Sequence, residues 1–296
     1  MRATEGMTSV VIDATVRPLS ARLLRALRRL GPRYAALIGL SALYFFPFIV
    51  VLTTSFKPPE EVFSIPPRLG SDRWTLDNYG DALTGMPFGR YLFNTAFIAT
   101  LSVAGQLLVS PLVAYSLAKI PWRGRDAMLV LILATLLLPP QVTLIPVYIL
   151  WAELGFTGSY VPLILPQFFG SAFFIFLLRQ FFRGIPEELL DAARVEGASE
   201  LTIYRRIVLP LAKPALVTVA IFTFMWSWTD FLLPLIYIDD PEQYTLSIGL
   251  YGFFSEHGVA WGALMAASVL MSLPLILVFL VGQRQFIRGI SVTGMK

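Results

Sequence analysis

Long apolar runs with almost no charged residues recur along this 296-residue chain and limit what it can fold into. A transmembrane helix needs about 20 mainly apolar residues. Six such runs span residues 34–55, 91–118, 127–152, 154–178, 214–238 and 258–283. Charged residues make up 14% of the chain, against about 25% in soluble domains. These are too few charged side chains to cover a folded surface that faces water. We therefore predict an all-α integral membrane protein with about six transmembrane helices.

The distribution of lysine and arginine predicts the orientation, because these residues mark the cytoplasmic side. They are frequent before the first run, between the second and third, between the fourth and fifth, and after the sixth. The loop at 239–258 has neither. This pattern predicts that both termini are cytoplasmic.

The chain before the first run is rich in arginine. The first apolar run, residues 34–55, is too long for the hydrophobic part of a signal peptide, and no small-residue cleavage site follows it, so we interpret it as an uncleaved span. A helical repeat of leucines favours an amphipathic helix on the cytoplasmic membrane surface, with an irregular basic leader as the alternative. These leucines are Leu19, Leu23, Leu27 and Leu30. We predict a leader at 1–33, a transmembrane domain at 34–283 and a cytoplasmic tail at 284–296.

The composition excludes several kinds of chemistry. The chain has no cysteine, which excludes disulfides, iron–sulfur clusters and cysteine nucleophiles. Its single histidine, His257, excludes a multi-histidine metal site. No glycine is followed by lysine, so the phosphate-binding motif G-x-x-x-x-G-K-[ST] does not occur. We predict no catalytic residue, no metal site and no bound cofactor on this chain.

The connection at 184–213, between the fourth and fifth runs, has helix signals of its own. Pro186 suits a first helical position, and Gly197 suits a C-cap because glycine adopts left-handed backbone angles. Ser199 can cap a second helix, which Leu209-Pro210 ends. The pattern predicts two short cytoplasmic helices joined by a glycine bend. They either transmit force from a partner into the spans or pack only on their own bundle.

The same segment carries a recognisable motif, Asp191-Ala192-Ala193, then Gly197, then Ile207-Val208-Leu209-Pro210. It resembles the EAA loop of ABC-importer permeases, in which Glu stands at the position of Asp191. Further stretches resemble the six-span partner of the maltose-type carbohydrate permeases, although Thr229 stands where that subfamily usually has Asn. These stretches are Asp77-Asn78-Tyr79, Asn94, 178–182, 228–234 and 288–295.

The resemblance implies a type I ABC importer permease fold in the plasma (inner) membrane of a bacterium or archaeon. It implies a second permease subunit, two ATP-binding subunits that hold ATP and Mg, and an extracytoplasmic solute-binding protein, with no nucleic acid. ATPase closure would then drive alternating access for sugars or related polar solutes. The coupling residues that it implies are Glu188, Asp191, Ala192, Ala193, Gly197, Leu209 and Pro210.

Asp230 is the only charged residue inside a predicted span, and such a residue is a candidate functional site because burying its charge in lipid is costly. Trp226 and Trp228 flank it, and aromatic faces beside a carboxylate suit sugars. The alternative is an interfacial aromatic belt with a partner-paired carboxylate.

Pro139-Pro140 predicts a kink in the third span. Gln141 follows the kink and either faces a solute path or sits beside a static kink. Asn94 either lines the path or bonds another helix.

An ion-coupled secondary transporter is the main alternative function. That class needs more intramembrane acids and often shows repeats, and this chain offers only Asp230. An intramembrane enzyme would need catalytic clusters that are missing from the sequence. A channel-like or scaffold subunit would not need the segment at 184–213.

Overall fold

The computed structural model describes residues 19–66, 68–255 and 258–293. The chain divides into two compact units, Met1–Val50 and Val51–Lys296, which we describe separately. The first unit contains most of α1 (Leu19–Thr54), whose stretch Pro32–Thr54 is apolar and long enough to cross a membrane. This agrees with the predicted first span. Helix α1 continues without a break through residue 33, and residues 1–18 of the predicted leader lie outside the described residues.

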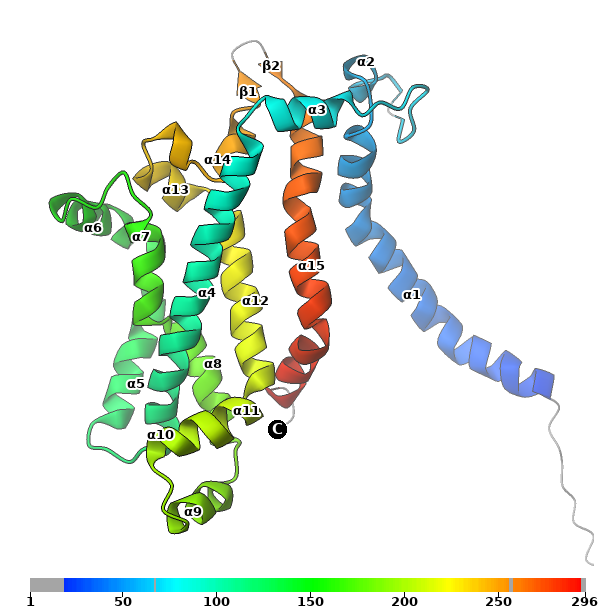
Figure 1. Cartoon of the computed structure of the whole chain (residues 1–296). Helices are drawn as coiled ribbons and strands as arrows, with labels where there is room; N and C mark the ends of the chain where they lie inside the picture. Colours follow the sequence, from blue (N-terminus) through cyan, green and yellow to red (C-terminus); the bar gives the residue numbers. More distant parts are fainter. Residues whose placement is uncertain (1–18, 67, 256–257, 294–296) are drawn as a thin grey trace, which may run out of the picture. The chain divides into compact units, whose positions relative to one another are not determined.

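In the second unit, long helices lie side by side around α4 (Phe88–Lys119) (Figure 1). Helix α4 packs against α8 (Ala172–Arg183) and α12 (Lys213–Thr229), and α12 also packs against α15 (Trp261–Thr293). Small residues on α4 allow close approach. At Gly105, an added Cβ would lie 2.7 Å from the ring of Phe168, which belongs to η2 (Leu165–Phe169).

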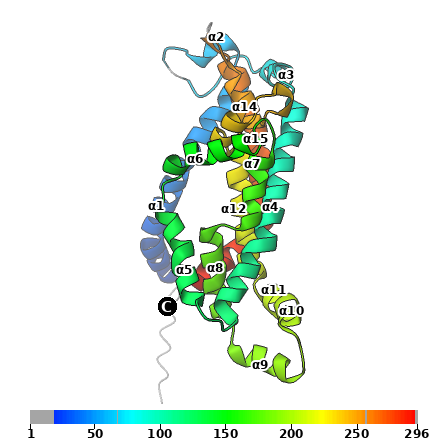
Figure 2. The same cartoon turned by 90° about the vertical axis from the view of Figure 1, so that its left-hand side faces the viewer.

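Shorter elements connect these helices. They are α2 (Pro59–Val62), α3 (Asp77–Thr84), α5 (Arg125–Ala134), η1 (Thr135–Leu137), α6 (Pro140–Glu153), α7 (Val161–Ile164), α9 (Glu187–Val195), α10 (Glu200–Ile203), η3 (Tyr204–Val208), α11 (Leu209–Leu211), α13 (Leu232–Tyr237), η4 (Pro241–Gln243), α14 (Leu246–Tyr251), β1 (Phe254–Ser255) and β2 (Gly258–Val259). The two strands form an antiparallel pair. In both views α9 and α10 lie at the opposite end of the unit from α3 and α14 (Figures 1 and 2), and the strands lie beside α14 in Figure 1.

The predicted kink in the third span is confirmed, and it divides the span into two helices. The helical stretches Arg125–Leu137 and Pro140–Glu153 meet at 99°. Pro139 is extended, with φ −61° and ψ 132°. A residue that precedes proline is disfavoured in the helical region, so the helix cannot continue through this pair.

The predicted fourth span, 154–178, is wrong at both ends, because the structure has Val161–Arg183. Gly155 and Gly158 adopt positive φ angles of 73° and 75° and belong to the turn before the span. The apolar run therefore began in a loop, which hydropathy alone did not distinguish from a helix.

The predicted ends of the last two spans also need correction. Helix α12 ends at Thr229, since Asp230 is extended with φ −64° and ψ 126°, so the span does not continue to residue 238. Asp230 thus lies in the link between α12 and α13, not inside a helix. The sixth span begins at Trp261, because Gly258 belongs to β2.

Among the described residues, four helices are long and apolar enough to cross a membrane, or up to six if each bent pair counts as one span. The second bent pair is Glu200–Leu211 with Lys213–Thr229, at 76°. The buried apolar residues of α8, α9, α10, α12 and the end of α4 form one cluster. The short helices at this end are therefore packed into the same core as the long ones.

Candidate functional site

The segment between α8 and α12 forms two short helices joined at Gly197, as predicted. Gly197 has φ +83°. Its N–H donates to the carbonyl of Arg194 (3.0 Å), and the N–H of Ala198 donates to that of Ala193 (2.9 Å). This pair of bonds is the Schellman motif that ends many helices at a left-handed glycine. Helix α9 begins at Glu187, so Pro186 precedes its first residue instead of occupying it.

The second short helix starts as predicted and ends later than predicted. The Ser199 side chain accepts a hydrogen bond from the N–H of Thr202 (3.3 Å), which caps α10. The backbone then widens into a π-helical turn, η3, and Leu209 and Pro210 lie within α11. The prediction that Leu209-Pro210 ends the helix is wrong. The helical backbone continues to Leu211 and bends at Ala212, because a proline near a helix start needs no N–H.

Arg194 connects the two short helices through its guanidinium. It donates to Asp191 (2.8 Å) and Glu187 (3.3 Å) on α9 and to Glu200 (2.9 Å) on α10. The hydrogen bond to Glu200 contributes most to raising the pKa of Arg194. Bonds from Arg194 and then Tyr115 lower the pKa of Glu200 below its ordinary value, although burial opposes them. The bend is therefore held by charge as well as by the glycine.

The same carboxylates fasten this segment to the end of α4. The Lys119 ammonium donates to Glu187 (2.8 Å) and to the carbonyl of Ile185 (2.7 Å). The Tyr115 hydroxyl donates to Glu200 (2.5 Å). We call these five side chains the Arg194 network: Tyr115, Lys119, Glu187, Arg194 and Glu200. Sequence analysis did not single them out, since the contacts of α4 join residues 66 to 85 positions apart.

Helix α9 has a buried face and an exposed apolar face. Leu190 is fully buried, and Ala193 is half-buried against the same core. On the opposite side Leu189 and Val195 are 48% and 89% exposed, with Ala192 exposed between them. An exposed apolar stripe on an otherwise charged helix is typical of a docking surface.

The predicted coupling residues divide between these helices. Glu188, Asp191, Ala192, Ala193 and Gly197 lie on α9 and at its end. Leu209 and Pro210 lie in α11, which leads into α12. A displacement of α9 and α10 would thus reach α12 directly along the backbone.

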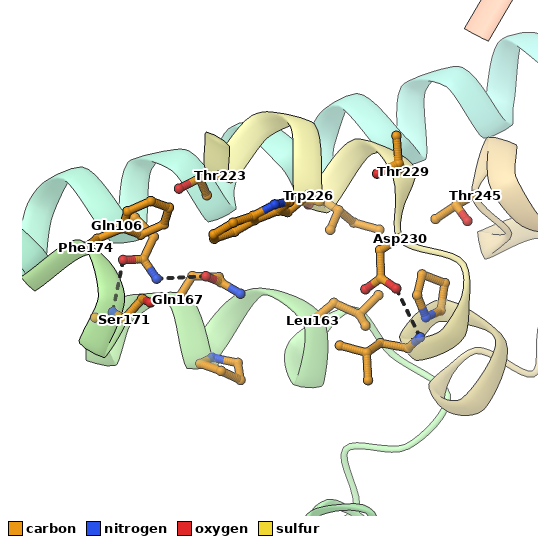
Figure 3. A pocket seen from close by; sticks show the side chains of 16 residues that line it. Gln106, Leu163, Gln167, Ser171, Phe174, Thr223, Trp226, Thr229, Asp230 and Thr245 are labelled. Carbon is orange, nitrogen blue, oxygen red and sulfur yellow. Dashed lines mark hydrogen bonds between the residues drawn. The ribbon is translucent and has the colours of Figure 1, made fainter. Parts of the chain in front are cut away.

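A cavity of about 500 Å³ lies among α4, the stretch from α7 to α8, and the α12–α13 link (Figure 3). Two of the predicted path residues, Trp226 and Asp230, line it. Its volume falls in the range of about 300–1,000 Å³ that is usual for small-molecule sites. Within the described residues, no group of three metal-ligating side chains occurs here or elsewhere.

Trp226 gives the cavity an aromatic surface. It is 53% exposed and stacks on Phe174, with ring centroids 5.3 Å apart and planes at 28°. Phe173 and Phe222 also lie against it, at centroid distances of 6.1 and 5.8 Å. These rings hold the indole in place beside the open space.

Polar groups face the cavity from α4, η2 and α8. The Gln106 amide donates to the Gln167 carbonyl oxygen (2.8 Å). The Gln106 oxygen accepts from the N–H of Ser171 (3.1 Å) and from the Ser110 hydroxyl (2.7 Å). Sequence analysis missed Gln106 and Gln167, although a polar side chain inside an apolar run was the available signal.

Asp230 closes one end of this polar lining. Its carboxylate accepts a hydrogen bond from the N–H of Leu233 (3.3 Å), which caps the short helix α13. Its own carbonyl accepts from the Ser247 hydroxyl (2.5 Å). Thr223 also lines the cavity, and its buried hydroxyl has no hydrogen-bond partner among the described residues.

Three predicted path residues lie outside this cavity. The Trp228 indole N–H donates to the carbonyl of Met271 (3.0 Å) in the core. Asn94 donates to the carbonyls of Glu242 and Tyr244, at 2.9 Å each. Gln141 is exposed in the first turn of α6. Asn94 and Trp228 therefore join distant segments of the fold.

The chain is similar to known transport proteins. A family model described as "Binding-protein-dependent transport system inner membrane component" matches residues 106–292. The Arabinooligosaccharides transport system permease protein AraQ of Bacillus subtilis (strain 168) is 35% identical over 260 residues, covering 87% of this chain and 92% of the relative. The Diacetylchitobiose uptake system permease protein NgcG of Streptomyces coelicolor is 32% identical over 261 residues, covering 87% and 86%.

A solved structure is similar over most of the chain. It is a crystal structure of a bacterial ABC transporter involved in the import of the acidic polysaccharide alginate. The TM-score is 0.77 at 25% sequence identity, and the match covers 88% of this chain and 98% of the other.

Proposed function

The chain belongs to the family of binding-protein-dependent transport system inner membrane components, and on this premise we propose how it couples ATP hydrolysis to solute movement. It is a multi-pass permease subunit of an ABC transporter in the plasma membrane. This family explains the long segment between α8 and α12, which an ion-coupled secondary transporter does not need. We propose that α9 and α10 dock on an ATPase subunit and pass its movement to α12.

The exposed apolar stripe of α9 is the observation that carries this proposal. Leu189, Ala192 and Val195 are exposed while the opposite face of α9 is packed into the core. The neighbouring Asp191 and Glu188 give the stripe a charged border that suits a polar rim around an apolar centre. The Arg194 network then makes the segment stiff enough to transmit displacement.

The partners follow from this arrangement. We propose two ATP-binding subunits, which hold ATP and Mg, a second permease subunit that completes the path, and an extracytoplasmic solute-binding protein. The chain itself carries no catalytic residue in this scheme. Since α9 and α10 must face the ATPases, we place the loop between α4 and α5 in the cytoplasm. The arginine distribution predicts the same side for both termini.

The solute is proposed to be a carbohydrate or a related polar compound. The names of the relatives support this, because they mention arabinooligosaccharides, diacetylchitobiose and alginate. Trp226, Asp230 and the two glutamines of the cavity provide an aromatic surface and hydrogen-bonding groups of the kind that sugar sites use. The names include neutral and acidic sugars, so they leave the charge of the solute open.

Affinity purification tests the coupling proposal. The tagged chain is solubilised gently from its native membrane, and co-purifying proteins are identified by mass spectrometry. The wild type should bring down an ATPase and a second permease. Val195→Asp places a charge at the most exposed residue of the stripe and should lose the ATPase while it keeps the second permease.

Glu196→Gln is the matched control, because Glu196 is the exposed neighbour of Val195 at the end of α9. It should retain both partners. Absence of any ATPase from the wild-type preparation would refute the proposed function. Full ATPase recovery with Val195→Asp would show that the stripe is not the docking surface.

A further inference from the structure

The charged groups that line the cavity beside Trp226 are of one sign. Of the 16 described residues that line it, Asp230 is the only ionisable one, and none is Lys, Arg or His. Among the described residues, the carboxylate of Asp230 interacts with the backbone N–H groups of Leu233 and Leu232 and has no cationic side chain as a partner. The described lining therefore carries a net negative charge.

One polar group of the lining is available to a ligand. The amide nitrogen of Gln167 donates no hydrogen bond within the described residues, while the carbonyl oxygen of the same side chain accepts from the Gln106 amide. This unused N–H can donate to a hydroxyl group of a bound solute.

Figure 3 shows how these groups are placed. The two glutamines lie at one end of the cavity, Asp230 at the other, and the indole of Trp226 between them. A sugar can pack a ring face on the indole while its hydroxyl groups donate to the carboxylate and accept from the Gln167 amide. A solute that carries its own carboxylate would meet a like charge where few waters screen it.

Resting on the proposed function, we infer that this cavity admits uncharged polyhydroxy solutes and that Asp230 excludes anionic ones. Asp230 is thus a specificity-determining residue for neutral over acidic saccharides. Trp226 and Gln167 carry no charge and can contact solutes of either class.

The absence of cysteine from the chain permits a direct test of this charge selectivity. Thr229→Cys places a single thiol in the lining next to Asp230. In the assembled transporter, we would measure the labelling rates of this thiol with an anionic and a cationic methanethiosulfonate of similar size. The ratio of the two rates cancels any effect of the neighbouring carboxylate on thiol reactivity.

The anionic reagent should label the thiol more slowly. Adding Asp230→Asn should raise the ratio of anionic to cationic labelling rates by about tenfold, which corresponds to about 1.4 kcal/mol. Asp239→Asn is the matched control, since Asp239 is exposed outside the cavity, and it should leave the ratio unchanged. An equal ratio with and without Asp230 would overturn the inference.

Competition extends the test to sugars. Arabinotriose should slow the labelling more than trigalacturonate at the same concentration, and Asp230→Asn should narrow the difference. Equal slowing by both sugars, or none by either, would also overturn the inference. Co-purification of the ATPase would be intact in each of these outcomes, so they are distinguishable from failure of the proposed function.

Discussion

Removal of the Arg194 side chain is the perturbation that the structure specifies most closely. Its guanidinium makes three ion-pair contacts and is 30% exposed. Partly exposed pairs contribute about 0.2–1 kcal/mol each. Arg194→Ala removes two pairs within α9 and the one pair that joins α9 to α10, so it should destabilise this segment by about 2 kcal/mol in total. That energy corresponds to about a thirtyfold increase in the population of the loosened segment.

The variant should still assemble, because the exposed stripe on α9 is unchanged. We expect backbone amides of α9 and the bend at Gly197 to exchange hydrogen about thirtyfold faster, since exchange reports local opening. In proteoliposomes, the number of solute molecules transported per ATP hydrolysed should fall, because part of the ATPase movement is absorbed by the loosened segment.

Arg205→Ala is the control for loss of a positive charge at the same end of the molecule. Arg205 is exposed, and no ion pair of Arg205 occurs within the described residues. It should leave exchange and coupling unchanged. Wild-type exchange rates in Arg194→Ala would refute the idea that the Arg194 network stiffens this segment, whatever its effect on transport.

Three further predictions concern backbone geometry, packing and pH. Gly197→Val puts a side chain at φ +83°. It should destabilise the bend by about 1–2 kcal/mol, seen as faster limited proteolysis at 184–213; equal proteolysis would refute the role of the left-handed turn. Gly105→Ala should lower the thermal unfolding temperature, since the new methyl meets the Phe168 ring at 2.7 Å and overpacking costs about 1–3 kcal/mol. Gly89→Ala, which meets no atom within 4 Å, should not. The pKa of Glu200 is lowered in the folded state, so its stabilising effect is complete above its ordinary value and is lost as pH falls through the lowered pKa. Lowering the pH should therefore reduce the thermal unfolding temperature of the wild type more than that of Glu200→Gln, and an equal pH dependence of the two temperatures would contradict this.

The sequence alone determined the features that depend on local chemistry. The apolar runs identify a membrane protein because crossing lipid requires length and hydropathy, which are properties of a segment. Gly197 and Ser199 marked the end of α9 and the start of α10 because helix caps are made by residues close in sequence. The motif from Asp191 to Pro210 similarly indicated the family before any contact was known.

Helix ends and side-chain directions were predicted less well from the sequence. An apolar run does not show where a helix stops, so α12 was predicted to continue beyond Asp230. Trp226 and Trp228 are two residues apart, which is about 200° around a helix. They consequently face a cavity and the core respectively, and helical geometry alone predicts that both cannot face the same space.

Only the tertiary structure decided which distant residues meet. Gln106 and Gln167 are 61 positions apart, and Tyr115 and Glu200 are 85 apart. Their pairing depends on how α4 packs against α8, α12 and the short helices, and no local pattern encodes that packing. The composition of each run thus determined that the chain crosses a membrane. The packing of the runs decided where the polar cavity and the Arg194 network lie, because both are built from side chains of several helices.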